Sequence, residues 1–536
     1  MIRPRRHFTQ QEICYLVAMN RLYQLSAAVI YIVLFFLLFP WYQYILDIDA
    51  ISYIHVAERF AKGEYYYSVN GYWSPLISWI LVPFINAGFD PVFTAKYING
   101  LLGLLTLFSC YSLIDKFTIN HLLKRILPFV LAVLLLSYAF YELCADLLQL
   151  FLLLLYINLI FSNDFIHTNG KIILAGVLGA FCYFAKAYNF PFFLLHFLIT
   201  LFVLVKKNYP VTVMRSFIKK AAVGLIAFFL LVTPYLVVLT HKYGSFRINN
   251  AGRLNLSWFL SAGTNDHRRM VAEPPFPDAT SYWDEPTYSQ EKYVGPFTSV
   301  GFFLKQIKLT ISNSIKFSGL LNQVTIFVYV ILVGFLFYLY RKKRDWPVNE
   351  NLLLFTTLLY PVGYLLIFIE WRYIWLLPVT ILLMAAVLLT WLSEQQLINK
   401  GAFIVLAFIV PGSFLLQPVN ELQDLRKNNE DVYEMAAIFK AQNIKGNFFL
   451  NYKSFVPYAK TVVLCYLTGS KLYGPAALDY NFEELMQSVD RYHINYYLFF
   501  YDFPSEKEIF LQSPYARAGI KIFDNLYPGL IVVQFK

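Results

Sequence analysis

The sequence predicts a polytopic α-helical membrane protein that carries a small α/β domain at its C-terminal end. Three observations lead to this fold class. Of the 536 residues, 58% are hydrophobic and only 14% are charged, which is unlike a soluble protein of this length. Apolar runs long enough to cross a hydrocarbon core of ~30 Å recur as far as about Leu416. From Gln417 onward, stretches with Asn, Lys and Asp replace them.

We therefore expect a transmembrane domain over residues 1–416 and a separate, water-facing domain over residues 417–536. No small-residue cleavage site follows the first apolar run, so we expect it to remain as a span rather than act as a signal peptide. The apolar runs predict about eleven spans, at 24–42, 93–115, 125–141, 146–162, 171–186, 188–205, 220–240, 319–340, 351–369, 373–391 and 401–416.

Basic residues predict the orientation, because they fall in every second connection between the spans. This pattern places the N-terminus in the cytoplasm and, with an odd number of spans, the C-terminal domain outside. We expect a plasma membrane location, the bacterial inner membrane. The net charge of +11 follows from these loops and requires no nucleic acid. The basic residues are Arg3, Arg5, Arg6, Lys124, Arg125, Lys206, Lys207, Lys219, Lys220, Arg341, Lys342, Lys343 and Arg344.

Two carboxylates, Asp47 and Asp49, directly follow the first predicted span. Charges near the bilayer boundary are costly unless they are paired or face water, so such acids commonly have a function. A helical pattern follows from Ala50 to Lys62, and Gly63 is placed to end it. Asp49 is therefore predicted as the N-cap of this helix, a structural role that is compatible with chemistry.

Further charged residues lie at outer span ends: Asp146, Lys186, Glu370 and Arg372. Each has a structural alternative. Asp146 could cap its helix, Lys186 could extend toward headgroups, and Arg372 could form a local salt bridge with Glu370. The long loop from His241 to about Ile315 adds Arg247 and Arg253. Its proline-rich part, 261–297, is predicted to form a lid over the site or a partly mobile segment.

The C-terminal domain alternates helical and extended patterns, which predicts a small α/β layer. Helices are expected at Asp431–Gln442 and Phe482–Tyr492, and strands at Asn447–Tyr452 and Tyr496–Tyr501. Segments 520–523 and 530–535 are expected to form a closing pair of strands. The domain contains no nucleophile elbow, phosphate-binding glycine loop or Cys/His cluster, so a second enzyme is not expected there.

The order of these elements resembles the GT-C superfamily of lipid-sugar-dependent glycosyltransferases, and within it the protein O-mannosyltransferase and aminoarabinose transferase branch. The resemblance covers about 1–416. Many relatives carry a second acid directly after the catalytic Asp, where this chain has Ala50, and Asp47 is the candidate to replace it. The matching residues are Asp49, Tyr53, Ala57 and Gly63, then Ser74-Pro75-Leu76, Ala145-Asp146-Leu147-Leu148, Ala185-Lys186-Ala187 with Pro191, and Arg372-Tyr373 with Leu376, Leu377 and Pro378.

The resemblance implies transfer of a sugar from a polyprenyl-phosphate-linked donor to an acceptor hydroxyl on the outer face, with inversion. Asp49 is the expected base, and Asp47 is the second catalytic candidate. The acceptor is a protein, a lipid or a glycan. The cofactor candidate is a divalent cation, for which no ligand triad is recognised. The substrate-binding candidates are Tyr53, His55, Asp146, Lys186, Arg247, Arg253, Glu370 and Arg372.

Two alternatives remain from the sequence. A polysaccharide polymerase or ligase would act on a lipid-linked oligosaccharide, and donor size would distinguish it from the first interpretation. A lipid-sugar transporter or flippase would place its charged groups near the bilayer midplane, often within internal repeats. For His55, a packed or hydrogen-bonded ring is the structural alternative to a substrate contact.

Overall fold

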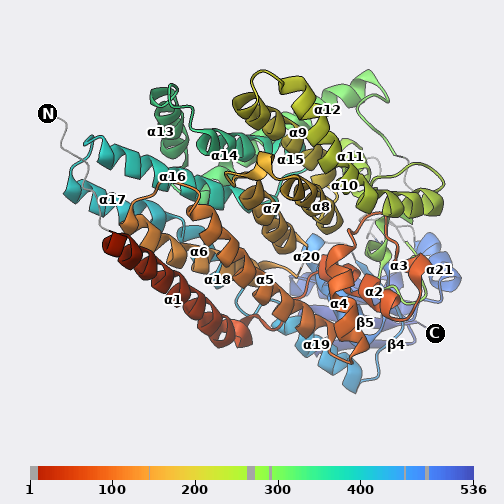
Figure 1. Cartoon of the computed structure of the whole chain (residues 1–536). Helices are drawn as coiled ribbons and strands as arrows, with labels where there is room; N and C mark the ends of the chain where they lie inside the picture. The colour runs from red at the N-terminus through yellow and green to blue at the C-terminus, as the bar shows by residue number, and fades with distance from the viewer. Residues whose placement is uncertain are drawn as a thin grey trace.

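The structure is a computed structural model that describes residues 10–143, 145–261, 272–288, 293–451, 454–476 and 482–535. Arg3, Arg5 and Arg6, which contribute to the predicted orientation, lie outside these residues. Helices form the chain up to Asp424, and a small sheet with its own helices follows at one end of the helical part (Figure 1).

The helical part contains α1 (Gln10–Tyr42), α2 (Ile48–Ala61), α3 (Tyr65–Ser68), α4 (Leu76–Asn86), α5 (Pro91–Ile114), α6 (His121–Tyr141), α7 (Asp146–Ile160), η1 (Phe165–His167), α8 (Asn169–Ala185), α9 (Asn189–Asn208), α10 (Val213–Tyr243), α11 (Ala251–Leu260), η3 (Tyr282–Asp284), η4 (Pro286–Tyr288), α12 (Val300–Val324), α13 (Val328–Arg341), α14 (Val348–Leu359), α15 (Val362–Ile367), η5 (Arg372–Ile374), α16 (Leu376–Glu394), α17 (Lys400–Ser413) and α18 (Leu416–Asp424).

All eleven predicted spans fall on helices, but not all are single straight crossings. Within the described residues, eight helices are long and apolar enough to cross a membrane. The bent pair α12 and α13 makes a ninth. The predicted spans 146–162 and 171–186 fall on α7 and α8, whose 15 and 17 residues are short for a ~30 Å core. The chain is therefore a multi-pass helical membrane protein, as predicted.

The prediction of one straight span at 319–340 was wrong, because the axis turns by 90° between α12 and α13. Thr325 is extended, with φ −167° and ψ 145°, and its hydroxyl accepts a hydrogen bond from the backbone N–H of Phe327. A second hydrogen bond, of 2.6 Å, joins the hydroxyls of Thr325 and Ser413. These side-chain bonds replace helical ones and end α12. The expected loop to Ile315 is also wrong, since α12 begins at Val300.

Close helix packing holds the bundle together, and glycine makes one crossing feasible. Helices α8 and α10 meet at Gly176, where an added Cβ would lie only 2.1 Å from the carbonyl oxygen of Gly224. No side chain fits there, so the two backbones pack directly on each other. Close approach of this kind strengthens helix association in a membrane, where apolar burial alone gives little driving force.

The C-terminal part matches the predicted helices and strands. It also contains elements that were not predicted, α20, β2, α22 and α23. Its five-stranded sheet has the order β2-β1-β3-β5-β4, with β2, β1 and β3 parallel and with β5 antiparallel to β3 and β4. The elements are α19 (Glu430–Ala441), β1 (Asn447–Asn451), α20 (Phe455–Thr468), β2 (Lys471–Ala476), α21 (Phe482–Arg491), β3 (Tyr496–Phe500), α22 (Pro504–Gln512), α23 (Pro514–Arg517), β4 (Lys521–Tyr527) and β5 (Leu530–Gln534).

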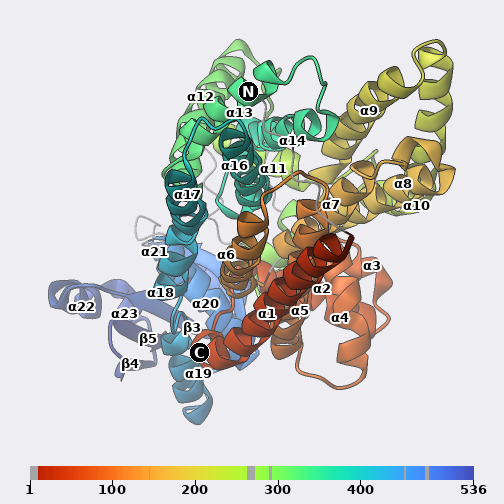
Figure 2. The ribbon, with the colours of Figure 1, turned by 60° about the vertical axis from the view of Figure 1, so that its left-hand side comes forward.

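The two faces of the sheet pack against different parts of the molecule. Phe448 and Leu450 belong to the same buried cluster as the helical part, and the Phe448 ring packs against that of Phe439 in α19. Phe449 and Phe499 face the other way, against α21 and α22. In the turned view of Figure 2, the sheet lies at the end of the bundle where α1, α2 and α5 finish or begin. One continuous core therefore joins the sheet to the helices.

Candidate functional site

A cavity of about 870 Å³ lies at the end of the bundle nearest the sheet. The connection between α1 and α2, the C-terminal ends of α6 and α8, the helices α11 and α15, and α20 all contribute to its wall. Eight of its lining residues carry formal charges, five acids and three bases. They are Asp47, Asp49, Glu142, Asp146 and Glu370, with Lys186, Lys316 and Arg372.

The start of α2 places Asp47 and Asp49 at this cavity. Asp47, not Asp49 as predicted, is the N-cap: its Oδ1 accepts from the backbone N–H of Ala50 at 2.8 Å. Its Oδ2 accepts from the N–H of Leu143 at 3.2 Å. Burial, followed by the charge of Asp49, raises the pKa of Asp47 to about 6. The prediction erred by two residues because α2 begins at Ile48, so Asp49 lies in its first turn.

Asp49 is held by two donors, one to each oxygen. The indole Nε1 of Trp283 donates to Oδ1 at 2.9 Å, and the guanidinium of Arg372 donates to Oδ2 at 2.9 Å. The Asp49 side chain is only 14% exposed. A carboxylate has about four lone-pair sites, so these two bonds fix its orientation and leave it able to accept a proton.

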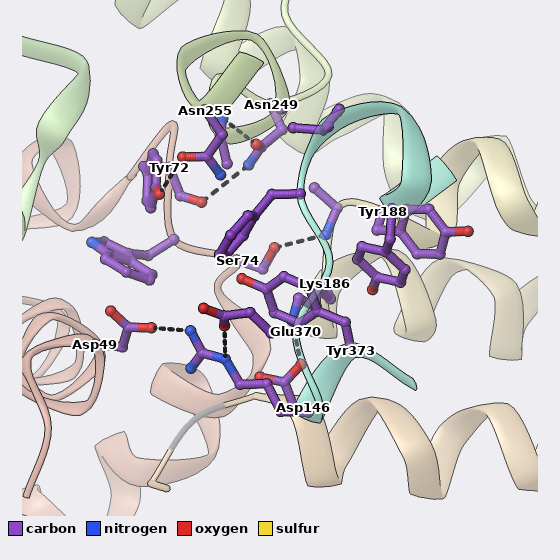
Figure 3. Close-up of a pocket in the computed structure, with 18 of the residues that line it drawn as sticks. Asp49, Tyr72, Ser74, Asp146, Lys186, Tyr188, Asn249, Asn255, Glu370 and Tyr373 are labelled. Atoms are coloured by element: carbon purple, nitrogen blue, oxygen red, sulfur yellow. Dashed lines mark hydrogen bonds and ion pairs between the residues drawn. The ribbon is translucent and has the colours of Figure 1, made fainter. Parts of the chain in front are cut away.

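Arg372 lies at the centre of three carboxylates, and Figure 3 labels two of them, Asp49 and Glu370. Its Nε donates to Glu370 at 3.0 Å, so the predicted local salt bridge is present. The two terminal nitrogens pair with Glu142 and Asp49. The forked guanidinium suits such a site, because it offers several donors in one plane.

A second charged pair, Asp146 and Lys186, lies on the side of Glu370 away from Asp49 in the same view. The Lys186 ammonium lies 3.9 Å from the centroid of the Tyr373 ring. Lys186 is thus turned into the protein rather than toward headgroups. The capping alternative for Asp146 is wrong, because Ala145 is the N-cap of α7 and Asp146 lies in its first turn.

Aromatic rings form a wall beside Asp49, made of Tyr72, Trp73, Trp258 and Trp283. The rings of Trp258 and Trp283 stack at 5.8 Å between centroids, and Trp73 meets Trp283 edge-on at 6.0 Å. The hydroxyl of Tyr72 donates to Asn255 at 2.8 Å. Flat apolar faces next to a fixed carboxylate can accommodate a ring that carries hydroxyl groups.

A buried network anchors Trp283 to α2. Asp284 lies 2.5 Å from Nδ1 of His55, and its Oδ2 accepts from the N–H of Thr280 at 2.9 Å. Arg59 pairs with Asp278 at 3.0 Å. For His55, burial lowers the pKa, but the charge and hydrogen bond of Asp284 outweigh it, so the net shift is upward. The pKa of Asp284 is shifted downward: its burial is outweighed by His55 and Arg59.

Not all predicted substrate contacts reach the cavity. Tyr53 lines it, but His55, Arg247 and Arg253 do not. His55 belongs to the buried network, in line with its structural alternative. Arg253 is exposed and lies over the ring of Tyr293. Of the predicted lid 261–297, the parts 262–271 and 289–292 lie outside the described residues, and 272–288 packs against α2.

Several cavity residues were not predicted as site residues, and three of them, Glu142, Trp283 and Lys316, matter most for the chemistry. Glu142 could have been found, since it directly follows the predicted span 125–141 on the same side as Asp49. Trp283 lies in a loop without periodicity, so nothing in the sequence connects it with Asp49. Lys316 follows a region that was predicted as loop, and its helix was not recognised.

The carboxylates of Asp47, Asp49 and Glu142 offer oxygen atoms within 4.8 Å of one another. Oxygen ligands of this kind suit hard divalent cations such as Mg²⁺ and Ca²⁺. The donor set therefore fits such an ion in ligand type, although Asp49 and Glu142 also bind Arg372. A cation held there would offset negative charge in the cavity.

Comparison with known proteins identifies a fold. No family model matches the sequence, and no curated protein matches it. Among solved structures, the chain is similar to ArnT from Cupriavidus metallidurans, crystallised with undecaprenyl phosphate bound. The match covers 98% of each chain with a TM-score of 0.50 and 11% sequence identity. This likeness shows that the chain has an ArnT-like GT-C fold, as predicted.

Proposed function

We propose that the protein is an integral membrane glycosyltransferase that moves a sugar from a polyprenyl-phosphate-linked donor to an acceptor hydroxyl, with Asp49 as the base. One observation carries this proposal. In a fold shared with a protein crystallised with undecaprenyl phosphate, Asp49 lies in a cavity at a span end, held by Trp283 and Arg372.

Asp49 would act as the acceptor approaches the sugar. The acceptor oxygen forms a bond to the anomeric carbon, its proton passes to Asp49, and the bond to the phosphate oxygen breaks. The electron pair leaves with the lipid phosphate. A single displacement of this kind inverts the anomeric centre. The aromatic wall would hold the sugar ring against Asp49 by stacking.

Cations beside the phosphate would stabilise the charge that develops on it. Arg372 and Lys186 are the candidates from the sequence, and both are bound to carboxylates. The phosphate would therefore compete with these acids for the cations. We propose that a divalent cation held by Asp47, Asp49 and Glu142 would offset the charge of these acids and so reduce this competition.

The proposed orientation has the cavity and the sheet outside and the N-terminus in the cytoplasm of a bacterial inner membrane. The distribution of basic loops supports it. Lys207 and Lys342, from two predicted inner loops, both lie near Glu350, and neither lines the cavity. Residues 417–536 are proposed as the extracytoplasmic domain that braces this outer end.

The experiment is sugar transfer by the purified chain in nanodiscs, with a panel of polyprenyl-phosphate monosaccharides. We expect donor consumption by the wild type and its abolition in Asp49→Asn, which keeps the shape of the side chain but cannot take a proton. Asp115→Asn, far from the cavity and exposed, is the control variant.

Near-normal turnover by Asp49→Asn would show that Asp49 is not the base. If the lipid-sugar crosses the bilayer chemically unchanged, the transporter alternative replaces the enzyme. Activity only on a long lipid-linked glycan would favour the polymerase or ligase alternative.

A further inference from the structure

Lys316 differs from the other two basic residues of the cavity in that it forms no ion pair with a described carboxylate. Arg372 is bound by three carboxylates and Lys186 by Asp146. In the described part of the chain, no carboxylate forms an ion pair with Lys316. The contact of its ammonium is with the Phe368 ring, 4.6 Å from the centroid. Its positive charge is therefore available at the cavity wall.

The position of Lys316 is fixed by neighbouring contacts. Asn313, one turn earlier on α12, is buried and donates to the backbone oxygens of Leu365 and Ile367 at 3.0 and 3.2 Å. These bonds tie α12 to the end of α15. Phe368 follows α15 directly and also lines the cavity. Helices α11, α12 and α15 pack against one another (Figure 1).

One exposed stripe of α12 is apolar, beside exposed polar residues such as Lys308. Leu304, Ile307, Ile311 and Ile315 repeat at helical spacing and are 59%, 43%, 56% and 69% exposed. In a membrane protein such a stripe faces acyl chains. Lys316 is itself exposed and lines the cavity, so it lies where this lipid-facing surface meets the site.

We infer that Lys316 binds the phosphate of the polyprenyl donor at the rim of the cavity, with the lipid chain lying along the apolar stripe of α12. This inference rests on the proposed function and adds a phosphate-binding residue to it. The rim position matters because, besides Lys316, the cavity is lined by five acids and only two bases. A phosphate approaching from the bilayer therefore needs a cation that no acid already holds.

The test measures binding of undecaprenyl phosphate to the full chain in phosphatidylcholine nanodiscs. Charge-assisted bonds contribute roughly 1.5–3 kcal/mol, so we expect Lys316→Ala to weaken binding about tenfold or more. Lys316→Arg should restore most of the affinity. The matched control is Lys308→Ala, because Lys308 is exposed on the same helix but does not line the cavity. It should bind as the wild type does.

Equal binding by Lys316→Ala and Lys308→Ala, with Asp49-dependent transfer intact, would overturn this inference and leave the proposed function standing. Phosphatidylglycerol as the probe gives a second test. An equal Lys316-dependent affinity for that lipid would overturn the assignment to the donor, since any anionic headgroup would then suffice. A wild type that neither binds undecaprenyl phosphate nor transfers sugar would overturn both.

Discussion

Arg372 joins acids that lie far apart in the sequence, at positions 49, 142 and 370. Each carboxylate would be costly near a membrane boundary without a partner. One guanidinium satisfies all three, and the orientation of Asp49 depends on it. Removing a partner from such a buried set leaves uncompensated charge, which is far more costly than the pair is worth. Arg372 therefore has a structural role, whether or not it also binds the phosphate as proposed.

Substitutions of Asp47 can separate the contribution of its helix cap from the contribution of its charge. Asparagine caps helices about as well as aspartate, so Asp47→Asn should keep the bond to Ala50 through its amide oxygen, but its amide nitrogen cannot accept the N–H of Leu143. Because the folded-state pKa is raised to about 6, the ionised carboxylate disfavours folding above that pH. We expect Asp47→Asn to unfold near the wild-type temperature at pH 8, because removal of the buried charge offsets the lost bond to Leu143, and Asp47→Ala to lose ~1 kcal/mol.

Thermal unfolding at pH 5 and pH 8 measures this effect, with sugar transfer recorded in parallel. Because both oxygens of Asp47 accept backbone N–H groups, we do not expect Asp47 to take the acceptor proton, so its asparagine variant should retain part of its transfer activity. A loss as complete as that of Asp49→Asn would instead make Asp47 part of the chemistry.

At the scale of elements, hydrophobic composition and periodicity predicted the helices whose formation follows from their lipid surroundings. Every predicted span lies on a helix, because ~20 apolar residues in lipid have few other ways to satisfy their backbone groups. The start of α12 was missed because its lysines and polar residues lower its hydropathy, although Leu304, Ile307, Ile311 and Ile315 carry the helical spacing. The contact of Trp283 with Asp49 spans 234 positions, and local pattern carries no information on such a distance.

The segment that bears Trp283 is held to α2 by the His55–Asp284 pair, which predicts a pH dependence. The pKa of His55 is raised above 6.5, so its contribution is complete below pH 6.5 and is lost as pH rises through the folded-state value. The pKa of Asp284 is lowered below 3.8, so its contribution is complete above pH 3.8 and is lost on further acidification. Both contributions are present between about pH 4 and 6.5.

We therefore expect the unfolding temperature to fall as pH rises above 6.5, and the slope to flatten in His55→Gln. His167→Gln is the control, since that ring is on the opposite, basic-loop side and bonds the Tyr209 hydroxyl. Hydrogen exchange of residues 272–288 at pH 6 and pH 8.5 locates the effect. An unchanged slope in His55→Gln would show that other groups govern this pH range.

At the scale of the whole molecule, hydrogen bonds and helix packing connect the sheet to the site. The edge of β2 bonds the segment that carries Trp283: Leu472 donates to the oxygen of Thr280 at 2.7 Å, and Ala272 donates to that of Tyr473 at 2.8 Å. From the bundle-facing side of the sheet, α20 packs on α2 and lines the cavity with Phe455 and Ala459. The C-terminal part thus supports both sides of Asp49.

Two adjacent residues of β1 test this connection, because Phe448 and Phe449 are equally buried at 0% exposure but face opposite ways. Phe448 contacts Phe439 of α19 and belongs to the buried cluster that it shares with the bundle, whereas Phe449 belongs to the cluster formed with α21 and α22. Replacing either by alanine should cost about 3–5 kcal/mol of local stability. Measured well below the unfolding temperature and per folded molecule, transfer should fall several-fold more in Phe448→Ala than in Phe449→Ala. Since the two losses of volume are identical, equal activities would mean that the sheet holds itself together without positioning Asp49.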